Sequence, residues 1–212
     1  MHTGATVSKR RRKGKPTAGL LRVGKYTAPV QTAFKEWGIV VEALGRGGQI
    51  VVLRKGGIAE GRGGFQAEHE RFWLFPTRFH QQAEGVVEEA RAGFEDYELP
   101  PEEVLRIEFC AEVMEARRLD SLAAAQRLAG QHIWREEVIA ERFDWGRDAG
   151  IYAMAVKVRR LAAPVELPML ESYGGCKSWV ELEPSMNFAG TEPVLAEDVF
   201  AEKLAAFREA LA

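Results

Sequence analysis

Residues 53–81 hold the side chains in this chain that are best suited to bind or transform an anion. The segment reads LRKGGIAEGRGGFQAEHERFWLFPTRFHQ and combines cations, two histidines and a dense aromatic block. Eight of the 21 glycines lie between residues 45 and 64, where glycine lets the backbone turn sharply or approach a ligand closely. We expect this loop to bind phosphate or nucleic acid through Arg54, Lys55, Gly56, Gly57, Arg62, Arg71 and Arg78.

The distribution of charge supports an anion site in the same segment. The formal net charge is −2, but residues 1–30 contain eight cations and no acidic residue. The rest of the chain therefore has a charge of −10, within which residues 46–82 carry an excess of +3. Because an acidic surface repels anions, a cationic region within it steers an anion to that place. The alternative interpretation is a solvent-exposed turn whose cations are ordinary surface residues.

Acid–base catalysis on a phosphorylated or nucleotide substrate is an alternative function for the same loop. Its catalytic candidates are His69, Glu70 and His80, whose side chains can transfer protons. The eleven-residue separation of the two histidines matches no established metal-ligand spacing, so we expect no metal, and no motif indicates a cofactor. A restriction-type nuclease needs an acidic residue two positions before Lys157, where this chain has Ala155. That substitution argues against cleavage by this chain itself.

The composition predicts one domain that follows a basic tail. Residues 1–29 include the run SKRRRKGKP and lack apolar periodicity, so we expect a disordered tail. Residues 30–212 are enough for a single α+β domain. No run approaches the roughly 18 apolar residues of a membrane span, and the N-terminus lacks the apolar core of a signal peptide. Cys110 and Cys176 form no disulfide framework, so we expect free thiols in a cytoplasmic protein.

The first half of the chain is predicted to contain a β-hairpin and a buried strand. Two runs rich in β-branched residues, 39–44 and 49–54, flank a glycine corner, which is the pattern of a hairpin. Residues 72–75 are too apolar to face solvent and too few for a buried helix. They predict a buried strand that ends at Pro76, because proline cannot donate a ladder hydrogen bond.

The remaining periodicities predict a sheet with flanking helices. Apolar and polar residues alternate over 105–113, as in a half-exposed strand. Residues 132–143 fit a helix slightly better than a strand. Further strands are expected at residues 152–161 and 177–182, and helices at residues 33–37, 84–92, 120–128 and 195–211. The irregular alternation of strands and helices favours an α+β fold with a mixed, largely antiparallel sheet or a partly closed barrel.

Several runs resemble a known bacterial family. The words FKEWGIVVEALGRGGQIVVLRKGGI, HERFWLFPTRFHQ, IYAMAVKVRRL and GGCKSWVEL are similar to the family catalogued as domain of unknown function 1802. The resemblance spans about residues 32–211 and leaves the basic tail outside. Some relatives are joined to a restriction-endonuclease-like domain, which implies a link to DNA metabolism. A weaker similarity is to small RNA- and modified-base-binding barrels of the PUA-like type.

These observations leave three functions open. The first is a cytoplasmic nucleic-acid-associated binding module linked to DNA metabolism or restriction-modification, with the basic tail adding sequence-independent attraction. The second is the enzyme described above, acting at the glycine-rich loop. The third is a protein-interaction subunit, whose partners the sequence does not specify. We expect no membrane partner for any of the three.

Overall fold

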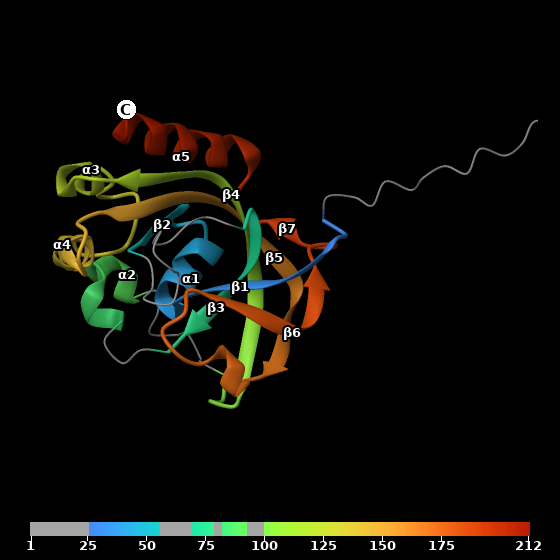
Figure 1. Ribbon diagram of the computed structural model, residues 1–212. Coiled ribbons are helices and arrows are strands. Elements are labelled where there is room, and N and C mark those ends of the chain that lie inside the picture. Colours follow the sequence, from blue (N-terminus) through green and yellow to red (C-terminus); the bar gives the residue numbers. More distant parts are fainter. Residues whose placement is uncertain (1–25, 56–68, 79–81, 93–99) are drawn as a thin grey trace, which may run out of the picture.

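The computed structural model describes residues 26–55, 69–78, 82–92 and 100–212, which form a seven-stranded sheet with surrounding helices (Figure 1). The strands are β1 (Pro29–Trp37), β2 (Val51–Arg54), β3 (Arg71–Thr77), β4 (Val104–Leu119), β5 (Ile151–Pro168), β6 (Trp179–Asn187) and β7 (Glu192–Pro193). The helices are α1 (Gly38–Gly45), α2 (Glu88–Ala92), α3 (Leu122–Gln126), α4 (Glu136–Asp144) and α5 (Glu197–Ala210), with 3-10 turns η1 (Gln82–Gly85) and η2 (Glu171–Tyr173).

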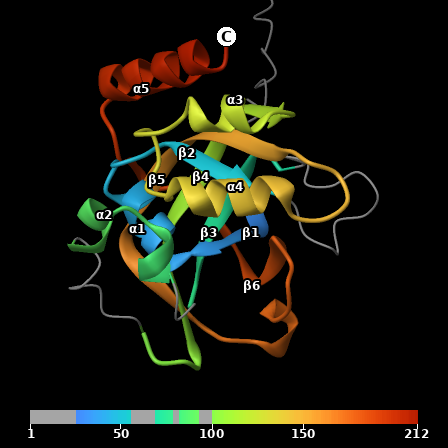
Figure 2. The same ribbon diagram turned by 90° about the vertical axis from the view of Figure 1, so that its left-hand side faces the viewer.

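The sheet is mixed and largely antiparallel, as the sequence predicts. Its strand order is β2-β5-β4-β3-β1-β6, with β7 beside β5. Only β1 and β3 run parallel among the described strands, and every other pair is antiparallel. Figure 1 shows α5 lying across the end of the sheet where β4 and β5 bend, and Figure 2 shows α4 in front of β2. None of the described helices is long and apolar enough to cross a membrane.

The predicted strands around residues 105–113 and 152–161 are confirmed and longer than expected. They form β4 and β5, which pair along most of their lengths with two register shifts. Phe109 and Ala111 lie in the larger apolar cluster, whereas Ile107 and Cys110 lie in a smaller cluster, and a register shift separates Ile107 from Phe109. Cys110 is therefore buried as well. It is a free thiol, as is the exposed Cys176, so this expectation is confirmed.

The predicted hairpin of residues 39–44 and 49–54 is wrong in its first strand. Residues 38–45 form α1, and the preceding residues 29–37, which include the predicted helical turn, form β1. Ile39, Val40 and Leu44 are buried on α1, so tertiary packing overrides their strand propensity. The second predicted strand is present as β2.

Strand β3 continues past the proline that was expected to end it. Residues 71–77 are extended, and Pro76 lies opposite Glu36 of β1. On the other side, β4 pairs only with Arg71, Phe72 and Trp73. Pro76 therefore lies where β3 has a partner on one side only, and the missing N–H breaks no ladder with β4.

The helices predicted after residue 80 are present with altered ends. The helix expected over residues 84–92 is divided into η1 and α2, because Val86 between them bridges to Trp134. Ser121 caps α3 by accepting a hydrogen bond from the Ala124 N–H, but α3 ends at Gln126 rather than near residue 128. The ambiguous segment 132–143 contains α4, and the C-terminal helix is α5.

Alternation along β1 determines which side chains enter each core. Phe34 points into the larger apolar cluster, with Phe72 and Leu74 of β3. Ala33 points into a smaller cluster on the other face, with Trp73. Two residues beyond Phe34, Glu36 shares its face and is brought into the interior.

The contact between α1 and β4 gives a stability prediction. A Cβ atom at Gly45 would lie 2.2 Å from the ring of Phe109. Gly45→Ala should therefore lower the free energy of unfolding by about 1–3 kcal/mol, measured by urea denaturation. Phe109→Leu makes room for the methyl group, so the double variant should lose less than the sum of the single losses. Additive losses would contradict the packing described.

Candidate functional site at the meeting of β1 and β2

The sheet curls until the end of β2 meets β1 and the start of β6. Arg54 of β2 donates to the Ser178 hydroxyl, with its Nη2 atom 3.2 Å from Oγ. Its Nη1 atom lies 3.9 Å from Oε1 of Glu36, and its guanidinium lies 5.5 Å from the ring centre of Phe34. Because β2 and β6 are at opposite ends of the strand order, these contacts describe a partly closed barrel. We call Glu36, Arg54, Arg142 and Ser178 the mouth site.

The Glu36 carboxyl group is the most buried charged group of the mouth site. Its side chain is 0% exposed. Oε1 accepts a hydrogen bond of 2.8 Å from the Trp37 N–H, whereas buried Oε2 has no hydrogen-bond partner among the residues that the structure describes. A buried carboxylate is tolerated only beside compensating positive charge, and an oxygen left without a donor loses its hydration without replacement.

Arg142 of α4 supplies a second positive charge. It donates to the Leu53 carbonyl oxygen at 3.2 Å, and its guanidinium lies 3.9 Å from the ring centre of Trp134. Burial lowers the pKa of Arg142 to about 10, against the opposing effect of Glu36. The side chain remains charged at neutral pH. Two guanidinium groups near one carboxylate leave the mouth site with a net positive charge.

Two lysines extend this positive charge toward the surface. Lys35 points away from Glu36, and its ammonium group donates to the carbonyl oxygens of Tyr173 and Gly175 at 2.8 Å each. Burial lowers the pKa of Lys35; Cys176 opposes this effect, and the nearby cations Arg54 and Lys177 add to it. We call Lys35, Arg54 and Lys177 the cation cluster.

Among the predicted anion-binding residues, Arg54 lies in the mouth site and Lys55 anchors the adjacent backbone. The Lys55 ammonium group donates to the carbonyl oxygens of Phe143 at 2.8 Å and Asp148 at 2.5 Å. Burial and the nearby Arg118 lower the pKa of Lys55. These two hydrogen bonds hold the end of β2 against the C-terminal end of α4.

His69, Glu70 and Arg71 lie together at the far end of that segment. They line an open hollow of about 510 Å³ beside the first residues of β1 and the outer part of β6. The His69 ring packs edge-on against Trp179, with centroids 5.0 Å apart, and Trp179 also contacts Phe34 at 4.8 Å. Trp179 therefore lies between the hollow, through its contact with His69, and the mouth site, through its contact with Phe34.

The other predicted site residues are separate or lie outside the described residues. Arg78 is exposed and donates to the Pro101 carbonyl oxygen at 3.0 Å. Gly56, Gly57, Arg62 and His80 lie outside the described residues, as does the basic tail up to residue 25.

The sequence analysis did not identify Glu36, Arg142, Ser178 or Lys35. Glu36 was hidden because residues 33–37 were interpreted as a helical turn. Recognition of a strand there would have placed Glu36 on the face of Phe34, which is an unusual position for an acidic residue. Arg142 lies on α4 far along the chain, and no local pattern connects it with β1.

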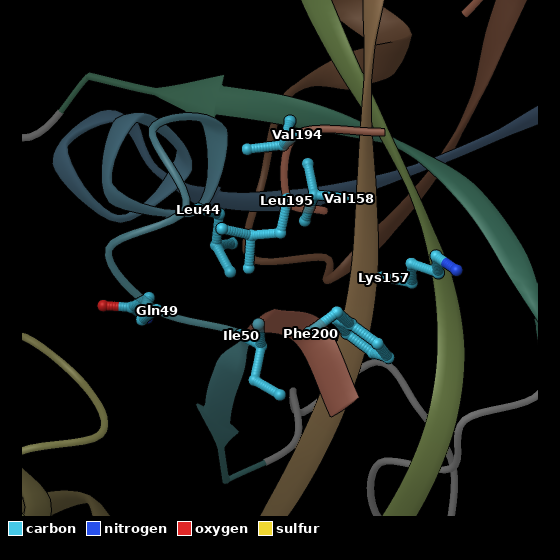
Figure 3. Close-up of a pocket in the computed structure, with 8 residues that line it drawn as sticks. All are labelled: Leu44, Gln49, Ile50, Lys157, Val158, Val194, Leu195 and Phe200. Atoms are coloured by element: carbon cyan, nitrogen blue, oxygen red, sulfur yellow. The ribbon is translucent and has the colours of Figure 1, made fainter. Parts of the chain in front are cut away.

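A second cavity does not offer a binding site. It is enclosed by Leu44, Ile50, Val158, Leu195 and Phe200, with only Gln49 and Lys157 as polar lining residues (Figure 3). Its volume of about 10 Å³ is about the smallest that can hold one water molecule. Within the described ranges, no group of three His, Cys, Asp or Glu side chains is placed to hold a metal ion.

His132, near Arg142, gives a pH prediction. Burial lowers the pKa of His132 to about 4, and Arg142 adds to the effect. The unfolded chain binds a proton near pH 6.5 whereas the folded chain does not, so stability is lost as the pH falls from 6.5 to about 4. The loss attributable to this group is up to about 3 kcal/mol. Urea denaturation at several pH values should show a weaker pH dependence for His132→Gln than for the parent.

The matched control for this experiment is His69→Gln, which removes a histidine at the rim of the hollow. It should keep the parent's loss of stability between pH 6.5 and 4. Equal pH dependence in all three proteins would show that His132 is not held neutral by the fold.

Comparison with known proteins gives a family and a likeness of fold. No curated protein matches the sequence. ASCH from Zymomonas mobilis has 14% identity and a TM-score of 0.41, over 82% of this chain and 93% of that chain. A serine-to-alanine mutant of the same protein gives 13% identity and a TM-score of 0.43, over 84% and 98%. At this level of similarity the likeness carries no information about function. The family model described as domain of unknown function (DUF1802) matches residues 33–206, and the chain therefore belongs to that family.

Proposed function

We propose that this protein is a nucleic-acid-binding module, linked to DNA metabolism, that binds the phosphate backbone at the mouth site. The observation that carries the proposal is the excess of positive charge there. Arg54 of the mouth site and Lys177 are close enough to Lys35 to lower its pKa, and Arg142 lies nearby in the interior. Their mutual repulsion is relieved when an anion binds, which favours a polyanion over a neutral ligand.

The surroundings of the cation cluster suit a phosphate group. Lys177 is exposed and Arg54 is partly exposed, so both can reach a ligand from solvent. The Ser178 hydroxyl is fully buried and accepts from Arg54, so its role in this proposal is to position that guanidinium. Lys55 serves a different role in this proposal, because its hydrogen bonds fix the backbone beside the site.

The remaining predicted residues extend the proposed interface. Arg71 lines the neighbouring hollow, and Arg78 is exposed beyond the end of β3. Gly56, Gly57 and Arg62 lie in sequence between Lys55 and His69, outside the described residues, and we include them in the proposed interface on sequence grounds. The link to DNA, and to restriction-modification, rests on the resemblance to relatives that carry an endonuclease-like domain.

An enzyme acting on a nucleotide substrate is the second candidate. The observation that favours it is the open hollow, where His69, Glu70 and Arg71 combine an imidazole, a carboxyl group and a guanidinium. Turnover of a nucleotide or strand by the purified protein, lost in His69→Gln and Glu70→Gln, would favour this candidate over binding alone.

The proposed function predicts a change in the salt dependence of binding. Arg54→Gln combined with Lys177→Gln should remove two phosphate contacts. The plot of log K against log salt for a single-stranded thymidine oligonucleotide should then flatten by about 1.4 units, from roughly 0.7 per contact. Fluorescence anisotropy in protein without residues 1–25 measures this change, since the eight cations of that segment would otherwise add to the slope.

The control is Arg46→Gln combined with Arg135→Gln. These side chains are 50% and 46% exposed and lie outside the mouth site, so they remove the same charge from elsewhere on the surface. The control should keep the parent's slope. If the two double variants lose the same slope, attraction is general to the surface and the mouth site is not the interface. Thermal melting of each variant verifies folding.

A further inference from the structure

The buried Oε2 atom of Glu36 needs a hydrogen-bond donor that the described part of the chain does not supply. Buried carboxylate oxygens in folded proteins nearly always accept hydrogen bonds, so an exception at a candidate site indicates a missing partner. The nearest cation, Arg54, approaches the other oxygen and stays at 3.9 Å, which is too long for a hydrogen bond. The geometry therefore leaves an acceptor for a group that is not part of the described chain.

Arg54 is the weakest-held member of the mouth site. Its two hydrogen bonds to Ser178 are long, at 3.2 and 3.3 Å, and its side chain is 24% exposed, whereas that of Glu36 is 0% exposed. Arg54 therefore lies nearer to solvent than the carboxylate and is free to turn outward at little cost.

Arg142 explains how Glu36 can tolerate the departure of Arg54. Its guanidinium is fixed by the Leu53 carbonyl oxygen and lies close to the rings of Trp134 and Trp37. It remains near Glu36 when Arg54 moves, so the buried carboxylate keeps one compensating positive charge. One carboxylate with two arginines is thus suited to release one arginine to a ligand.

We propose that Arg54 turns outward to a phosphate of the bound strand and that Glu36 Oε2 then accepts a hydrogen bond from an N–H group of one unpaired base. This inference rests on the proposed function and names its substrate class, a strand with unpaired nucleotides. The pairing edge of a base carries its N–H donors, and in a duplex those donors are occupied. A base that reaches a buried carboxylate must also leave the stack.

The apolar side chains beside Glu36 suit a base rather than a second phosphate. The Arg54 guanidinium lies 5.5 Å from the ring centre of Phe34, and the Trp179 ring packs against Phe34 with centroids 4.8 Å apart. Aromatic rings stabilise unstacked bases in proteins that bind single strands, whatever the base sequence. The mouth site thus combines cations at its rim with an acceptor and aromatic rings inside it.

Thymine allows a direct test, because N3–H is the single hydrogen-bond donor of this base. The probes are a thymidine oligonucleotide and the same strand made of N3-methylthymidine, which keeps the phosphates and rings but lacks the donor. The full chain should bind the thymidine strand about tenfold or more tightly than the methylated strand, as expected for a hydrogen bond to a charged group. Glu36→Met, verified by thermal melting, should bind both strands equally.

Each outcome has one meaning. Equal affinity of the parent protein for the two strands overturns the inference while leaving strand binding intact. A preference that persists in Glu36→Met overturns it as well, because the donor is then recognised by another group. Failure to bind either strand overturns the proposed function together with the inference. If Glu36→Met does not fold, the parent protein's comparison of the two strands still decides whether the N3 donor is recognised.

Discussion

A buried carboxylate that must keep positive charge beside it is the constraint around which this molecule is arranged. Glu36 enters the interior because strand alternation places it on the face of Phe34. Its compensating groups come from β2 and α4, which are distant in sequence. Arg54 joins the two ends of the strand order, and Arg142 joins α4 to β2 through the Leu53 carbonyl oxygen. The same three charges therefore lie where the two ends of the sheet meet and define the mouth of the partly closed barrel.

The electrostatics of the mouth site connect this architecture with binding. A buried ion pair is weak evidence for stability, since desolvation offsets much of the attraction. An excess of cations around one carboxylate lowers stability further, unless an anion is present to compensate. The arrangement of Lys35, Arg54 and Lys177 is thus better explained by a ligand than by folding alone. Lys55 fixes the local backbone rather than attracting an anion, because its ammonium group donates hydrogen bonds to backbone carbonyl oxygens at the end of α4 and beyond it.

The sequence predicted the sheet better than the site. Alternation over residues 105–113 identified β4, since buried and partly exposed residues alternate there from Leu105 to Phe109. The strand prediction failed for residues 39–44, because a helix buried on several sides carries the same β-branched residues as a strand. The interpretation of residues 33–37 as a helical turn hid Glu36, whose significance depends on which face of β1 it occupies. Arg54 was recognised from its place beside the glycine-rich loop, whereas the proximity of Glu36 to Arg142 arises only from tertiary structure.

The central claim is that a single strand enters the mouth site. The indole N–H signals of the five tryptophans give a direct measurement by NMR during titration with a thymidine oligonucleotide. Trp37 and Trp134 lie against Arg142, and Trp179 lies beside Phe34, so their signals should shift and saturate together. Trp73, whose indole donates to the Val30 carbonyl oxygen in the smaller core, should stay unchanged. Saturable binding that leaves Trp37, Trp134 and Trp179 unshifted would contradict the account.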